Sequence, residues 1–133
     1  MAVGVMVVDD QPQFRWMMRE VIGAMPGFEI LGECSSGEQS LGEAAALRPE
    51  LILMDVRMPG MGGVEAARKI LDAQPDIVVL LISAQEADCC LPAAAASSGA
   101  AAFVRKQDLR PRHLAELWER YRPVTAAPLP PAR

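Results

Sequence analysis

The chain has 133 residues, of which 51% are hydrophobic, and this length and composition suit one domain with one buried core. Its formal net charge of −4 argues against a nucleic-acid-binding face, which would need clustered basic residues. The first apolar run ends at Asp9, too early for a signal peptide or a membrane span, so we expect a cytoplasmic protein without a membrane partner. The three cysteines, Cys34, Cys89 and Cys90, are expected to be free thiols.

Strand-like and helix-like segments alternate along the chain. Apolar runs predict five strands, at residues 3–8, 28–34, 51–54, 77–82 and 101–104. Helical spacing and boundary residues predict five helices, at residues 13–25, about 37–47, about 64–73, a short Ala-rich stretch from about 91, and about 111–122. The remaining residues, 123–133, contain four prolines and no apolar pattern, so we expect a domain over residues 1–122 and a disordered Pro-rich tail.

This alternation predicts an α/β fold, in which right-handed crossovers place helices on both faces of a parallel sheet. Five strands suit the flavodoxin-like order 2-1-3-4-5, whose switch point lies between strands 1 and 3. Asp9 and Asp10 follow the first predicted strand, and Asp55 follows the third. Because open α/β sheets bind ligands at the carboxyl ends of their strands, these three carboxylates are expected to meet in one site.

The side chains at this edge of the sheet have the chemistry of a phosphate site. Three close carboxylates repel one another unless a cation is present, and a site built from carboxylates suits Mg²⁺. An aspartate there can act as a nucleophile and form an aspartyl phosphate. Lys106, just past the last strand, can pair with a phosphoryl oxygen, and Ser83 can offer a hydroxyl to another.

Taken together, these motifs resemble a response-regulator receiver domain of the CheY-like kind over about residues 3–122. The likeness rests on four runs at these spacings, which are Val7-Val8-Asp9-Asp10, Met54-Asp55-Val56-Arg57-Met58-Pro59-Gly60-Met61-Gly62-Gly63, Ser83-Ala84 and Phe103-Val104-Arg105-Lys106. Many receivers have a proline with a cis peptide bond after the lysine, whereas this chain has Gln107. In this respect the chain is similar to the NarL/FixJ subgroup, and the geometry of the Lys106-Gln107 peptide stays open.

The resemblance implies a role in phosphoryl transfer for four residues. Asp55 would accept the phosphoryl group from a histidine kinase, and Lys106 and Ser83 would hold it. Phe103 would be the aromatic residue that turns inward when Ser83 moves toward the phosphate, which shifts the population between two states.

The resemblance also implies a set of Mg²⁺ ligands. Asp10 would bind the ion directly, Asp9 mainly through water, and Asp55 through its carboxylate. The backbone carbonyl of Arg57 would be a further ligand.

The expected partners are a sensor histidine kinase or a histidine phosphotransfer protein, and an output protein that the sequence does not identify. The short tail predicts a stand-alone receiver, monomeric or weakly dimeric, that switches a protein-binding surface or relays phosphate. Such a protein is no enzyme beyond removing its own phosphoryl group. Two alternatives are a receiver-like scaffold that is never phosphorylated and a receiver fragment of a DNA-binding transcriptional regulator.

Two further classes lack their defining motifs in this chain. A phosphatase of the haloacid dehalogenase kind needs Asp-x-Asp, where this chain has Asp55-Val56-Arg57. A flavodoxin needs a Ser/Thr-rich phosphate loop after the first strand, where this chain has Asp9-Asp10-Gln11-Pro12.

Overall fold

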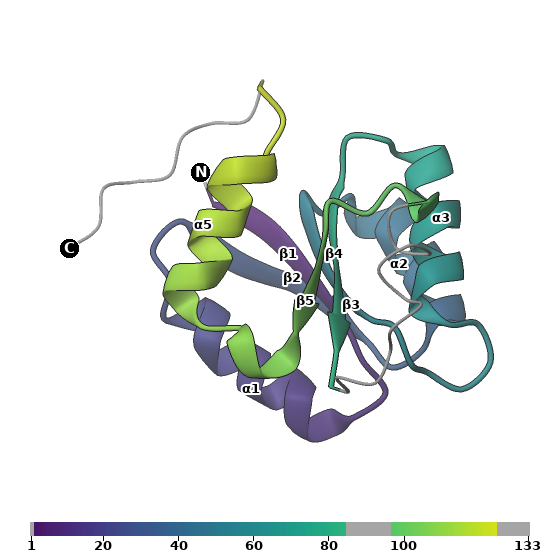
Figure 1. Cartoon of the computed structure of the whole chain (residues 1–133), viewed down its shortest axis with the longest axis horizontal. Helices are drawn as coiled ribbons and strands as arrows, with labels where there is room; N and C mark the ends of the chain where they lie inside the picture. Colours follow the sequence, from purple (N-terminus) through teal and green to yellow (C-terminus); the bar gives the residue numbers. More distant parts are fainter. Residues whose placement is uncertain (1, 85–96, 125–133) are drawn as a thin grey trace.

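The computed structural model describes residues 2–84 and 97–124, and its centre is a parallel sheet of five strands (Figure 1). The strands are β1 (Val3–Val8), β2 (Phe28–Cys34), β3 (Leu51–Asp55), β4 (Val78–Ser83) and β5 (Ala102–Arg105). They lie in the order β2-β1-β3-β4-β5, and all four neighbouring pairs are parallel. The predicted order 2-1-3-4-5 is therefore confirmed.

Helices cover both faces of the sheet, as the alternation of segments predicted (Figure 1). They are α1 (Pro12–Gly23), α2 (Gly37–Leu47), α3 (Gly63–Ala73) and α5 (Pro111–Tyr121), with a 3₁₀ turn at Lys106–Asp108. The Ala-rich helix predicted from about residue 91 lies outside the described residues, apart from Ser97 and Ser98, which are helical. Within the described ranges, no helix combines the length and the hydropathy needed to cross a membrane.

Two apolar layers sandwich the sheet. Side chains of a strand alternate between its faces, so Val5 and Val7 of β1 pack toward α1 and α5, whereas Met6 and Val8 pack toward α2 and α3. Every residue of β1, β3 and β4 is buried, as expected for parallel strands covered on both sides. The sheet is thus packed on both faces and carries the site residues at its carboxyl edge.

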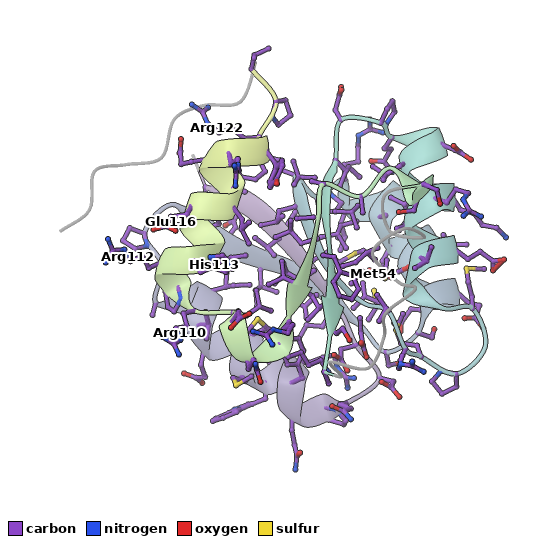
Figure 2. All side chains as sticks on the ribbon, viewed as in Figure 1. Met54, Arg110, Arg112, His113, Glu116 and Arg122 are labelled. Atoms are coloured by element: carbon purple, nitrogen blue, oxygen red, sulfur yellow. The ribbon has the colours of Figure 1, made fainter. Side chains whose placement is uncertain are left out.

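The α5 helix shows how one amphipathic element closes this core. Leu114, Leu117 and Trp118 are buried against the sheet. Arg112 and Glu116 point away from it and form an ion pair of 3.4 Å between Nε and Oε1 (Figure 2). Helical periodicity alone therefore separates the apolar and polar sides of α5.

Several element boundaries differ from the predicted ones. The first helix, predicted over residues 13–25, begins at Pro12 and ends at Gly23. It stops short of residue 25 because a proline at position 26 disfavours helical backbone at Met25. The strands β3, β4 and β5 each end one residue later than predicted, since parallel pairing extends as far as Asp55 with Ile82 and Ser83 with Arg105.

Of the three cysteines, Cys34 at the end of β2 is a buried free thiol, and burial raises its pKa to about 11. Cys89 and Cys90 lie outside the described residues. The Cys34 thiol is consequently protonated at neutral pH and acts as a small apolar side chain.

Candidate functional site

Three aspartates meet at the carboxyl edge of β1 and β3. Asp9 and Asp10 directly follow β1, and Asp55 is the last residue of β3, the neighbour of β1 in the sheet. Each of the three offers a carboxylate oxygen, and these oxygens all lie within 4.8 Å of one another. Strand pairing therefore brings together the carboxylates that the sequence placed at this edge.

The backbone and one carboxylate oxygen of Asp9 are held by hydrogen bonds. Its N–H donates to the Cys34 carbonyl at 3.0 Å, and its carbonyl accepts from Nη1 of Arg15 at 2.6 Å. Its Oδ1 accepts from the Gln11 N–H at 2.8 Å. The other oxygen, Oδ2, is buried, and no donor among the described residues is aligned to hydrogen-bond it. Asp9 thus presents to the site one anionic oxygen that accepts no aligned hydrogen bond from the described residues.

Lys106 supplies the positive charge of the site. It begins the 3₁₀ turn after β5, and its Nζ lies 2.7 Å from Oδ2 of Asp9 and 3.8 Å from Oδ2 of Asp55. The ammonium therefore forms a close ion pair with Asp9, although it lacks the alignment of a hydrogen bond. The peptide bond between Lys106 and Gln107 is trans, which resolves the geometry that the sequence left open.

Asp55 is a buried carboxylate whose pKa is raised to about 6. Burial is the main cause, and the nearby Asp9 carboxylate adds to it, whereas Lys106 lowers the pKa in opposition. Oδ1 of Asp55 also accepts a hydrogen bond of 3.4 Å from the Arg57 N–H. Crowded, buried carboxylates of this kind are stabilised by a cation.

The donor set fits Mg²⁺. The ion prefers oxygen ligands and is commonly bound through one or two carboxylates with several waters. The carboxylates of Asp9, Asp55 and the more exposed Asp10 can supply these oxygens.

The other two residues predicted for phosphoryl and metal binding lie at the same edge of the sheet. Ser83 is the last residue of β4 and is buried, one position beyond the residue that pairs with Asp55. Arg57 is exposed in the loop that follows β3.

Phe103, the predicted switch residue, is in the middle of β5. Its side chain is half-buried and packs against the apolar layer on the α2–α3 side of the sheet. It lies opposite Leu81 in the register, so it is close to the end of β4 that carries Ser83. The structure places Phe103 on β5 but does not bring it into the carboxylate cluster.

Sequence reasoning missed three residues of α1 and its leading loop that contact the site. Gln11 and Arg15 hydrogen-bond to Asp9, and the ring of Phe14 lies beneath the Lys106 ammonium. In the sequence, Phe14 is one of several apolar residues at helical spacing. This pattern does not distinguish it from the other core residues of the helix.

The raised pKa of Asp55 predicts how stability depends on pH. An acid with a raised pKa in the folded state binds more protons when folded, so stability falls as pH rises from about 4 to about 6. In the presence of EDTA, we expect Asp55→Asn to be about 1–2 kcal/mol more stable than the wild type at pH 7.5, a value reduced by solvent screening. This advantage should vanish near pH 4, as measured by urea unfolding. An advantage that stays constant between these pH values would contradict the assigned pKa.

The sequence model of the response regulator receiver domain matches residues 5–118. The chain belongs to the response regulator receiver domain family. The receiver is 42% identical over 86 residues to the response regulator GacA of Pseudomonas viridiflava, a match that covers 65% of this chain and 40% of GacA. It is 35% identical over 107 residues to a protein-glutamate methylesterase/protein-glutamine glutaminase of Alkalilimnicola ehrlichii, covering 80% of this chain and 27% of that protein. The receiver thus spans less than half the length of these curated relatives.

Solved structures agree with this assignment. The signal receiver domain of the response regulator NarL from Mycobacterium tuberculosis is 30% identical and superimposes with a TM-score of 0.80, covering 89% of this chain and 97% of that one. A LuxR-family two-component response regulator from Aurantimonas is 26% identical with a TM-score of 0.80, covering 90% of this chain and 84% of that one. These similarities support the receiver fold.

Proposed function

We propose that this receiver, formed by residues 1–122, is cytoplasmic and accepts a phosphoryl group on Asp55 from a phosphohistidine of a sensor histidine kinase or histidine phosphotransfer protein. The observation that carries the proposal is the cluster of three carboxylates within 4.8 Å, with the Lys106 ammonium 3.8 Å from Asp55. This arrangement pairs a nucleophilic carboxylate with groups that bind a cation and a phosphate.

In the proposed reaction, a carboxylate oxygen of Asp55 attacks phosphorus while the bond from phosphorus to the histidine nitrogen breaks. Mg²⁺ held by Asp9, Asp10 and Asp55 would neutralise the phosphoryl oxygens. The Lys106 ammonium would pair with one of these oxygens. The proposed further ligand is the backbone carbonyl of Arg57.

The phosphoryl group would then change a protein-binding surface or pass to a further protein. Ser83 would donate its hydroxyl to a phosphoryl oxygen, and Phe103, half-buried on the neighbouring strand, would become more buried. Such a shift changes the populations of two conformations rather than creating a new fold. In this proposal the receiver is a switch and has no catalytic turnover beyond removing its own phosphoryl group.

Acetyl phosphate, a small phosphoryl donor, tests the proposed chemistry without a kinase. After incubation with acetyl phosphate and Mg²⁺, intact-mass spectrometry should show a gain of one phosphoryl group. The gain should disappear when EDTA removes the cation, because the crowded carboxylates would then repel the donor. A chain that gains no phosphoryl group under any of these conditions would favour the scaffold alternative.

An exposed apolar patch on α1 suits docking of the phosphodonor protein. Trp16 and Met17 are 59% and 42% exposed, and with Pro12 and Gln13 they line a hollow of about 430 Å³. The patch begins two residues after Asp10, so a protein seated on it would reach the site. Exposed aromatic side chains commonly dominate the energy of such contacts.

This patch predicts a difference between protein and small-molecule donors. With a histidine kinase that phosphorylates the wild type, Trp16→Ala should slow phosphoryl transfer roughly fivefold or more. The rate with acetyl phosphate should be unchanged, since that donor needs no docking surface. Tyr121→Ala, which removes an exposed aromatic side chain from α5, is the matched control and should transfer at the wild-type rate. Equal slowing with both donors would contradict a docking role.

A further inference from the structure

Four groups surround the ammonium of Lys106, and two of them come from outside the carboxylate cluster. Oε1 of Gln11 accepts a hydrogen bond from Nζ at 3.3 Å. The ring of Phe14 lies beneath the same Nζ, 4.3 Å from nitrogen to ring centroid. This distance is well within the range in which the face of an aromatic ring attracts a cation. Only 13% of the lysine side chain is exposed, and this shielding from water strengthens the attraction between the ammonium and the ring.

Core packing holds the Phe14 ring in place. The side chain is 6% exposed and belongs to the apolar cluster that also holds Leu109, Leu114 and Trp118. Phe14 is therefore a fixed surface beneath a long, charged side chain. Unlike the two carboxylates, the ring is uncharged and is not a ligand for Mg²⁺.

We propose that Phe14 is a positioning residue that holds the Lys106 ammonium where it can bind a phosphoryl group on Asp55. The inference rests on the proposed function. Asp9, 2.7 Å away, and Asp55, 3.8 Å away, attract the ammonium less strongly once a bound cation neutralises their charge. The attraction of the ring persists when those oxygens turn toward a bound cation or phosphoryl group. Phe14 thereby keeps the lysine localised in both situations.

Nuclear magnetic resonance can detect this contact directly, because the chain has only two lysines, Lys69 and Lys106. With lysine labelled by ¹³C at Cε, the ε-protons of Lys106 should resonate upfield of those of Lys69, which is exposed on α3. The shift arises from the ring current of Phe14, so it should be lost in Phe14→Leu. It should persist in Phe28→Leu, which shortens another buried aromatic side chain of the same cluster.

Beryllofluoride, a phosphoryl analogue, tests the positioning role. In the presence of Mg²⁺, Phe14→Leu should bind beryllofluoride roughly three- to tenfold more weakly than the wild type, as measured by titration calorimetry. Its affinity for Mg²⁺ alone should stay within about twofold, because the carboxylates are unchanged. Phe28→Leu should match the wild type in both affinities.

The outcomes separate this inference from the proposed function. Equal weakening of beryllofluoride binding in Phe14→Leu and Phe28→Leu would show a general loss of packing and overturn the inference. Wild-type affinity in Phe14→Leu, or an unshifted Lys106 signal in the wild type, would also overturn it. If the wild type itself fails to bind beryllofluoride with Mg²⁺, the proposed function falls and the phosphoryl-positioning role falls with it.

Discussion

Asp55→Asn is expected to abolish phosphoryl incorporation from acetyl phosphate, to below detection by intact-mass spectrometry. The amide has no anionic oxygen to attack phosphorus, and the neighbouring carboxylate of Asp9 is paired with Lys106 at 2.7 Å. The same substitution removes a buried charge, so the variant should remain folded and should be more stable than the wild type when the cation is removed. Loss of function with a gain in stability is the signature expected of a functional carboxylate.

A matched control for this experiment is Asp72→Asn, which removes an exposed carboxylate of α3 far from the carboxyl edge of the sheet. It should gain one phosphoryl group at the wild-type rate. If Asp55→Asn still gains a phosphoryl group, the acceptor is another residue, and peptide mapping after borohydride reduction would locate it. That result would overturn the assignment of Asp55.

Gly63→Ala is expected to cause a large loss of stability for the addition of a single methyl group. A Cβ on Gly63 would clash with the carbonyl oxygen of Asp55 and would lie 2.9 Å from Cα of Val56. Both are backbone atoms, so α3 or the end of β3 would have to move. Such overpacking should cost about 2–4 kcal/mol in the free energy of unfolding, as measured by urea denaturation.

Gly42→Ala provides the opposite control within a helix. Gly42 lies inside α2, and nothing is within 4 Å of the position that its Cβ would occupy. Alanine should therefore stabilise the protein by about 0.5–1 kcal/mol through helix propensity. If Gly63→Ala proved as stable as the wild type, that result would contradict the close packing of α3 against the backbone of Asp55. Because that packing fixes the acceptor strand, Gly63→Ala should also slow phosphorylation by acetyl phosphate.

The sequence alone was sufficient to predict the sheet order and the carboxylate cluster. Apolar runs define strands, their alternation with helices defines a parallel sheet, and parallel strands place their carboxyl ends at one edge. Asp9, Asp10 and Asp55 follow from these rules, because each sits at the end of an apolar run. This reasoning uses only local patterns, and it needs no knowledge of how side chains pack.

Only the tertiary structure decided how these residues interact. Lys106 lies closer to Asp9 than to Asp55, and it is held there by Gln11, which is 95 positions away in the sequence, and by Phe14. The raised pKa of Asp55 likewise depends on burial by neighbouring strands. Contacts of this kind arise where separate elements meet, and their distances depend on how helices pack against the sheet. A residue pattern along one strand or helix does not specify that packing. The sequence therefore identified the reactive groups, and the fold determined their geometry.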